Sequence, residues 1–240
     1  MALLFTTAAG AFAAVKKAEY STYSNGRFGF SMKYEKNMMK PGESENGDGA
    51  VFYSRNGTDI RAYAGYVIGT PDEEINYYLP QTTSSKLFFL KNGYLIYDNN
   101  TKAKVKTLNL IFINNSTHYQ FDFTMKYDFY NAYKAVAGTM LKSVSPLQSK
   151  EFSTPDAAYF IDNLDKILGG EAKALAALKK KVRFKSTAKI VCNNVFRTGG
   201  KTYYLFCDLY DEYAPSYAVE YVNNGVYLFQ GRNKPLKSIK

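Results

Sequence analysis

Two apolar runs joined by an Asn-Asn pair occupy residues Ala103–Met125, which read AKVKTLNLIFINNSTHYQFDFTM. In the second run, Thr117–Met125, apolar and polar residues alternate with a period of two. That period is typical of a half-buried β-strand, and Asn is a residue that favours turns. The stretch therefore predicts two antiparallel strands, Ala103–Ile113 and Thr117–Met125, with a turn at Asn114-Asn115.

The flanking residues add further elements to this strand pair. Tyr94–Asp98 predicts another antiparallel strand, and a helix is expected after Asp128, a plausible N-cap residue, because apolar residues recur there at helical spacing. Upstream, the sequence predicts one strand with alternating polarity, a hairpin and a short helix: Arg27–Tyr34, Ala50–Ser54 with Ile60–Val67, and Asp72–Leu79. We expect residues 19–147 to form one α+β domain.

Several motifs in this first half resemble the PsbP-like family. The opening carries Tyr23-Ser-Asn-Gly-Arg-Phe-Gly-Phe-Ser-Met-Lys-Tyr34 and Glu43-Ser-Glu-Asn-Gly-Asp-Gly49, and the closing part carries Lys106-Thr-Leu-Asn-Leu-Ile-Phe-Ile113 and Tyr127-Asp-Phe-Tyr-Asn-Ala-Tyr133. The resemblance covers residues 20–147, and the family includes bacterial exported proteins. It implies an antiparallel sheet sandwiched by helices and a role in binding proteins, with no shared catalytic residues to carry over. Residues 148–240 resemble no family.

The remaining part, residues 148–240, predicts a smaller α+β domain. Thr154-Pro155-Asp156 is a strong helix start, since a capping hydroxyl precedes a proline at the first helical position. Gly169-Gly170 predicts the end of this helix, and a second helix is expected from Glu171 to about Lys180. A four-stranded antiparallel meander is expected to follow, with strands Val182–Phe196, Thr202–Tyr210, Tyr217–Val222 and Val226–Gln230.

The first 18 residues suggest export. Residues 1–15 carry no charge, and Ala11-Phe12-Ala13 fits the small-residue pattern of a signal-peptide cleavage site. The apolar run is too short to span a bilayer. Because no Lys or Arg precedes it, a buried first helix or strand is the alternative. We expect residues 1–18 to be a signal peptide and the protein to be periplasmic or secreted, with no transmembrane segment.

The two cysteines flank the Gly-Gly turn of a predicted hairpin. With a turn centred on Gly199 and Gly200, Cys192 and Cys207 would lie opposite each other on neighbouring strands. Directly opposed strand residues are close enough for a disulfide after small adjustments, and an exported protein meets an oxidising compartment. We therefore expect a Cys192–Cys207 disulfide; two reduced thiols packed in a core are the alternative.

The composition limits the chemistry. With 31 Lys and Arg against 21 Asp and Glu the net charge is +10, and one His and two Cys leave few residues for metal, redox or hydrolytic sites. We expect no cofactor and no metal. His118, with Asp122 four residues on, could be oriented as a base, but a polar strand face explains the same pattern. The loop Glu43–Asp48 could offer oxygen ligands to Ca²⁺, yet it lacks EF-hand spacing and is interpreted as a polar turn.

A cluster of Lys and Arg residues is the feature of the sequence that most strongly indicates a function. Six cations lie within eleven residues that contain no acid: Lys179, Lys180, Lys181, Arg183, Lys185 and Lys189. On the expected strand Lys181, Arg183 and Lys185 share one face, and Lys102, Lys104 and Lys106 repeat this spacing in the first half. A strand edge protected against aggregation is the structural alternative. The functional interpretation is attachment to an anionic protein or envelope surface; nucleic acid is not expected, because no reader motif is present.

Two function classes follow from these patterns. We favour a non-enzymatic exported binding protein that uses basic and aromatic surfaces to engage an anionic macromolecule. The alternative is a cell-envelope hydrolase with a site between the two domains, in which carboxylates such as Asp208, Asp211 and Glu212 act as general acid and base. Two close carboxylates in a deep cleft would favour the enzyme, and a shallow basic face would favour binding.

Overall fold

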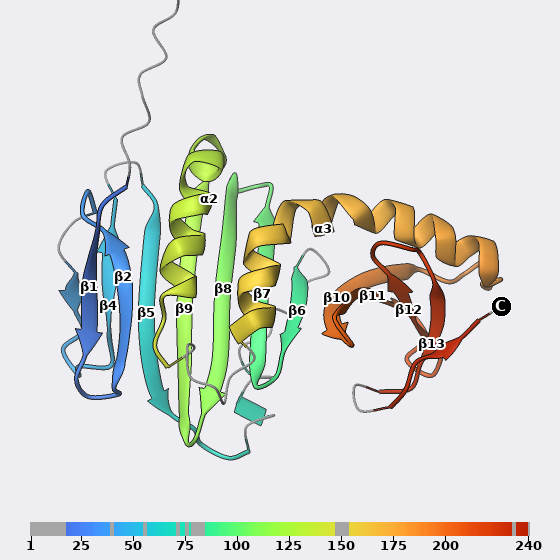
Figure 1. Cartoon of the computed structure of the whole chain (residues 1–240), viewed down its shortest axis with the longest axis horizontal. Helices are drawn as coiled ribbons and strands as arrows, with labels where there is room; N and C mark the ends of the chain where they lie inside the picture. The colour runs from blue at the N-terminus through green and yellow to red at the C-terminus, as the bar shows by residue number, and fades with distance from the viewer. Residues whose placement is uncertain are drawn as a thin grey trace, which may run out of the picture.

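The computed structural model describes residues 18–38, 41–54, 57–70, 73–74, 77, 85–146, 154–231 and 234–239. The expected signal peptide and most of the linker before Thr154 lie outside these residues. Figure 1 shows an elongated molecule in which one sheet runs through both halves of the chain. The hairpin β1 (Tyr20–Asn25) and β2 (Phe30–Glu35) stands apart from that sheet. The helices are α2 (Tyr127–Lys142) and α3 (Thr154–Lys181).

The sheet of the described residues has twelve strands. In sheet order they are β14 (Lys237–Ser238), β13 (Val226–Phe229), β12 (Ser216–Glu220), β11 (Lys201–Asp208), β10 (Ile190–Thr198), β6 (Lys86–Leu90), β7 (Gly93–Asn100), β8 (Val105–Asn114), β9 (Thr117–Lys126), β5 (Asp59–Tyr66), β4 (Gly49–Tyr53) and β3 (Gly42–Glu43). All neighbours pair antiparallel except β10 and β6, which pair parallel. The fold is therefore α+β, as expected.

The central hairpin of β8 and β9 confirms the strand prediction. Leu108 lies opposite Phe123 and Leu110 lies opposite Phe121, and all four side chains are at most 2% exposed. Side chains alternate along a strand, so the polar residues between them face the other side of the sheet. The turn joining the two strands places Asn115 at a φ of 53°, a left-handed conformation that Asn tolerates better than most residues.

The β1–β2 hairpin, α2 and α3 lie side by side on one face of the sheet and cover it (Figure 1). Phe30 of β2 reaches this core, where its ring lies edge-on to Phe121 with centroids 5.6 Å apart. At the other side of the same layer, Phe88 of β6 and Phe160 of α3 pack with centroids 5.2 Å apart. Burying a Phe side chain contributes about 2–3 kcal/mol, so these rings hold both halves to one core.

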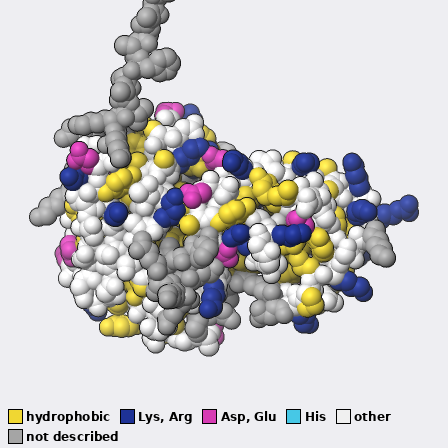
Figure 2. Space-filling model, viewed as in Figure 1, with side chains coloured by type: hydrophobic (Ala, Val, Ile, Leu, Met, Phe, Trp, Pro, Cys, Tyr) yellow, Lys and Arg dark blue, Asp and Glu magenta, His cyan; other side chains and the backbone are white. Residues whose placement is uncertain are grey.

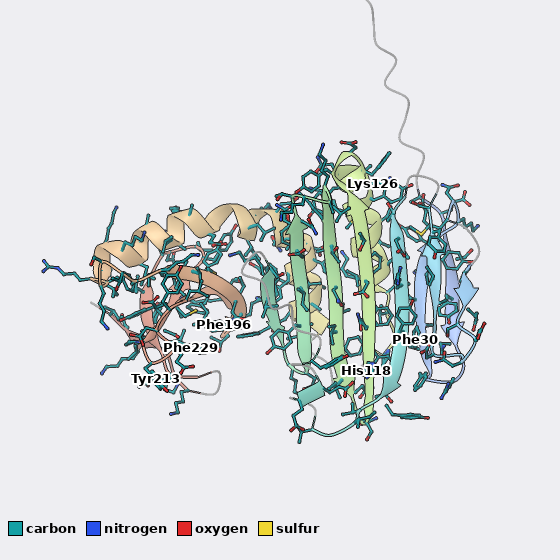
Figure 3. The ribbon with its side chains drawn as sticks, turned by 180° about the vertical axis from the view of Figure 1, so that it is seen from behind. Phe30, His118, Lys126, Phe196, Tyr213 and Phe229 are labelled. Atoms are coloured by element: carbon teal, nitrogen blue, oxygen red, sulfur yellow. The ribbon has the colours of Figure 1, made fainter. Side chains whose placement is uncertain are left out.

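Of the helices expected to sandwich the sheet, the two long ones, α2 and α3, lie on this same face. Figure 3 shows the molecule from behind, with the strands of the sheet in front of α2. The short helix expected at Asp72–Leu79 is described only at residues 73, 74 and 77, which are helical. Glu74 from this segment contacts the sheet, since its Oε1 lies 2.9 Å from Nδ1 of His118. None of the helices in the described part of the chain has the length and apolar character of a membrane-crossing segment.

The prediction of two helices after residue 154 is wrong, because α3 continues through Gly169-Gly170 to Lys181. Packing explains why glycine is present at the second of these positions. The hydroxyl of Tyr204, on β11 beneath the helix, donates a 2.6 Å hydrogen bond to the carbonyl of Ile167. A Cβ at Gly170 would overlap that hydroxyl. Gly170 therefore permits close approach of helix and sheet and does not end the helix.

The expected meander is present as β10–β13, with β14 added at the edge. Its first strand begins at Ile190, eight residues later than predicted, so residues 182–189 are irregular. We refer to residues 154–239 as the C-terminal unit. It joins the first half through two parallel residue pairs between β10 and β6, where Asn194 lies opposite Leu87 and Val195 opposite Phe88. The side chain of Lys86 supports this junction by pairing with Glu171 at 2.9 Å and by donating to the carbonyl of Cys192.

Candidate binding site of the C-terminal unit

The predicted basic cluster lies where α3 ends and the chain returns to β10. We call it the basic segment: Lys179, Lys180, Lys181, Arg183, Lys185 and Lys189. The first three form the last turn of α3, where cations are favoured by the negative end of the helix dipole. All six residues are exposed. Figure 2 shows Lys and Arg side chains gathered at this end of the molecule, with few acidic ones beside them.

The expected strand face at Lys181, Arg183 and Lys185 is not part of a strand. Val182 and Phe184 are nevertheless half-buried and pack against the core, so alternate residues are exposed, as the sequence suggested. The ring of Phe184 lies edge-on to Tyr217 of β12, with centroids 5.8 Å apart. Hydrophobic anchoring of alternate residues thus holds the basic side chains outward without a ladder of backbone hydrogen bonds.

Most of the positive charge of the basic segment is uncompensated. Lys185 pairs with Asp211 at 3.4 Å, and its side chain remains 80% exposed. The other five have no ion pair with any residue in the described ranges. Exposed cations without local partners leave a positive potential that extends about 8 Å into a solution of physiological ionic strength.

A pocket opens beside the basic segment. Its volume is about 140 Å³, and its walls are mainly apolar: Phe184, Ile190, Phe206 and Tyr217. Arg183 and Lys185 line it as well, and these two also border an adjoining hollow of about 430 Å³ that includes Lys179. The site therefore combines an apolar recess with a cationic rim.

Two of the three carboxylates predicted for acid–base chemistry line this pocket, but they act as turn caps. Asp208 Oδ1 accepts hydrogen bonds from the backbone N–H groups of Lys189 and Tyr210 at 3.0 and 3.1 Å. Asp211 Oδ1 accepts one from the N–H of Tyr213 at 3.2 Å. Glu212 is exposed and does not line the pocket. All lining residues come from 183–217. The pocket therefore lies within the C-terminal unit, whereas the hydrolase hypothesis required a site between the two halves.

The loop after β11 exposes apolar and aromatic side chains next to the basic segment. Tyr210 is 71% exposed and Tyr213 is 90% exposed, and Leu209 is exposed beside them. Figure 3 shows Tyr213 at the side of the C-terminal unit away from α3. The ammonium group of Lys189 lies 5.7 Å from the ring centroid of Tyr210. Exposed aromatic side chains beside cations are a combination found at protein-binding surfaces.

The second basic group is not brought to this site. Lys102 and Lys104 lie in the exposed turn before β8, and the N–H of Tyr127 donates to the carbonyl of Lys104. This turn is therefore close to Lys126, at the far end of the first half from Tyr213 in Figure 3. Lys106 is only partly exposed, because its ammonium group lies 4.0 Å from the ring centroid of Tyr130. It serves packing between β8 and α2.

The predicted alignment of the cysteines is wrong. The turn at Gly199-Gly200 is present, but a bulge between Cys192 and Asn194 shifts the register by one residue, so Cys207 lies opposite Val191. Side chains alternate, and the shift therefore separates the two sulfurs, which are not joined by a disulfide. Burial raises the pKa of the Cys207 thiol, with a further contribution from Asp208, so this pocket residue is poorly suited to act as a nucleophile.

The remaining candidate residues have structural partners. His118 pairs with Glu74, and Gln120 donates to Asp122 at 2.8 Å, so the structure shows neither residue oriented by the other, and the favoured interpretation of a polar strand face holds. Burial lowers the pKa of His118, and Glu74 partly opposes this. In the loop Glu43–Asp48, Asn46 donates to Asp48 at 2.8 Å. No group of His, Cys, Asp and Glu side chains positioned to hold a metal is found among the described residues.

Comparisons with known proteins find solved structures of low similarity and no function. No protein-family model and no curated protein matches the chain. The solution structure of cyanobacterial PsbP (CyanoP) from Synechocystis sp. PCC 6803 matches with 14% identity and a TM-score of 0.39, covering 57% of this chain and 97% of that one. A crystal structure from Bacteroides thetaiotaomicron VPI-5482 matches with 14% identity and a TM-score of 0.35, covering 65% and 60%. The first match agrees with the resemblance to the PsbP-like family; neither match indicates an activity or a partner.

Proposed function

We propose that this chain is a non-enzymatic binding protein that engages an anionic macromolecule through the basic segment and the adjoining tyrosines. The observation that carries the proposal is the uncompensated charge: of six exposed cations, one forms an ion pair with a described residue, and that pair is long. Export to the periplasm or out of the cell is part of the proposal, and it rests on the pattern of residues 1–18.

Two further features support binding over catalysis at this site. Asp208 and Asp211 accept hydrogen bonds from the backbone N–H groups of Lys189, Tyr210 and Tyr213, so their carboxylates hold the chain segments around the pocket in place. In addition, Tyr210 and Tyr213 expose large rings that contribute little to the core. Tyrosine side chains of this kind supply contact area at a low cost in conformational entropy.

The proposal is tested by reversing charge in the basic segment. A variant with Lys181→Glu, Arg183→Glu and Lys185→Glu should lose retention on poly-glutamate beads at low salt, because the positive potential is removed. A control with the same change in net charge, Lys91→Glu, Lys102→Glu and Lys104→Glu, alters exposed residues elsewhere and should be retained.

Retention of the native protein should also fall as salt is raised, since screening weakens exposed charges. Sedimentation with vesicles of anionic phospholipid provides the second arm of the experiment, and it reports whether an envelope surface is bound instead of an acidic protein. If the basic-segment variant and the control are retained equally on both supports, the proposed function is wrong.

A further inference from the structure

We propose that the pocket beside the basic segment accepts one aromatic side chain from an acidic segment of a partner protein. This inference rests on the proposed function and specifies its partner. It follows from three properties of the pocket: its size, the character of its walls and the state of the charges around it.

The size fits a single ring. An apolar cavity of about 150 Å³ in another protein holds one benzene molecule, and the pocket here measures about 140 Å³. Its apolar walls include the rings of Phe184, Phe206 and Tyr217 and the side chain of Ile190. Rings lined up around such a space favour edge-to-face or offset packing with an inserted aromatic group. The acyl chain of a membrane lipid is far longer than this space.

The charges around the pocket favour an anion next to that ring. Two cations and two carboxylates line it, yet the carboxylates already accept hydrogen bonds from the loop, and Asp211 also pairs with Lys185. Arg183 has no ion pair with a described residue, and its guanidinium group can bind a carboxylate with two hydrogen bonds. The adjoining hollow adds Lys179, so anionic groups on either side of an inserted ring would meet cations.

The two parts of the site make separable contributions. Burying an aromatic side chain in the pocket should strengthen binding by about 10- to 100-fold relative to alanine at the same position. The cations should supply a salt-dependent contribution that does not require the ring. An acidic partner peptide without an aromatic residue would therefore bind weakly, and a positively charged partner peptide with an aromatic residue would be repelled.

The experiment compares three short peptides by fluorescence polarisation, each labelled at its amino end. They have the sequences Glu-Glu-Phe-Glu-Glu, Glu-Glu-Ala-Glu-Glu and Lys-Lys-Phe-Lys-Lys. The native protein should bind the first at least about 10-fold more tightly than the second, and it should not bind the third. Equal affinity for the first two peptides overturns the pocket assignment, and binding of the third overturns the role of the cations.

A pocket-filling variant gives the complementary test. Ala188 lines the pocket, so Ala188→Leu should remove the advantage of the phenylalanine peptide while leaving the alanine peptide bound as before. Ala103→Leu, in an exposed turn of the first half, is the matched control and should behave as the native protein. Far-ultraviolet circular dichroism shows whether each variant is folded. The comparison of the three peptides with the native protein does not depend on either variant.

Failure of this inference differs from failure of the proposed function. If charge reversal in the basic segment weakens both acidic peptides equally and the phenylalanine gives no gain, the pocket assignment is wrong and anion binding stands. If neither acidic peptide responds to charge reversal, the proposed function fails as well. Loss of vesicle sedimentation in Ala188→Leu would assign the pocket to a membrane surface and overturn the protein partner.

Discussion

The adjacent glycines of α3 should respond to alanine with opposite signs. Gly169 is exposed, and a Cβ there would meet nothing within 4 Å. Gly169→Ala should therefore stabilise the protein by about 1 kcal/mol, because alanine restricts the unfolded chain and favours the helix. For a chain of this length that corresponds to a rise in Tm of about 2–4 °C.

Gly170→Ala gains the same helix propensity but loses more through packing. The new Cβ would overlap the hydroxyl of Tyr204 and lie 2.9 Å from Cε2 of Tyr221. Tyr204 is 1% exposed and held by its hydrogen bond to Ile167, so it cannot move into solvent. Overpacking costs about 1–3 kcal/mol and a broken buried hydrogen bond a similar amount. We expect a net loss of about 2 kcal/mol, which is a fall in Tm of about 4–8 °C.

Thermal unfolding followed by circular dichroism measures both variants, and a third variant tests the cause. In a Tyr204→Phe background the overlapping oxygen is gone, so Gly170→Ala should cost less there, with a coupling of about 1 kcal/mol. A rise in Tm for Gly170→Ala that matches the rise for Gly169→Ala would refute the reasoning, since it would show that helix and sheet do not approach as closely as described.

Three other residues or pairs give further predictions. Burial raises the pKa of Asp122 from 3.8 to about 6, so the ionised side chain destabilises the folded protein. This loss of stability is complete above about pH 6 and disappears as the pH falls towards 3.8. Asp122→Asn should therefore add about 2 kcal/mol to the free energy of unfolding at pH 7 and little at pH 4; an equal gain at both would contradict this. Lys86→Met leaves the carboxylate of Glu171 without its cation at the junction of the two halves, and the urea midpoint should fall by the equivalent of about 2 kcal/mol. An unchanged midpoint would mean that the pair does not support the junction. Under native conditions a thiol reagent should modify Cys207 before Cys192, because Cys192 is 2% exposed and burial raises its pKa. Equal labelling of the two cysteines in peptide mapping would contradict the burial of Cys192.

The elements that the sequence predicted correctly are those with a clear local period. The alternation in Thr117–Met125 and the apolar spacing after Asp128 gave β9 and α2 to within a few residues. Local signals failed where long-range packing decided the outcome. Gly169-Gly170 has the composition of a helix end, but the hydroxyl of Tyr204 requires a glycine there and the helix continues.

The candidate site could be predicted only in part. The exposed basic residues were identified by composition, and their alternation with Val182 and Phe184 was correct although the strand was not. The pocket could not be predicted, because it forms where residues 183–190 meet the loop after β11. The cysteine alignment failed for a related reason: one extra residue in β10 changes the register beyond the bulge, and nothing in the composition marks it.

The parallel pairing of β10 with β6 also bears on how the two halves depend on each other. β6 reads Lys-Leu-Phe-Phe-Leu, a short apolar segment without proline, and 106 residues separate Lys86 from Cys192 across the junction. Until β10 has been synthesised, β6 is therefore an open sheet edge of the kind that recruits other chains. A chain ended at residue 147 would keep that edge and would lose the cover that α3 gives to Phe88. We therefore expect the C-terminal unit to protect the first half from self-association by covering this edge.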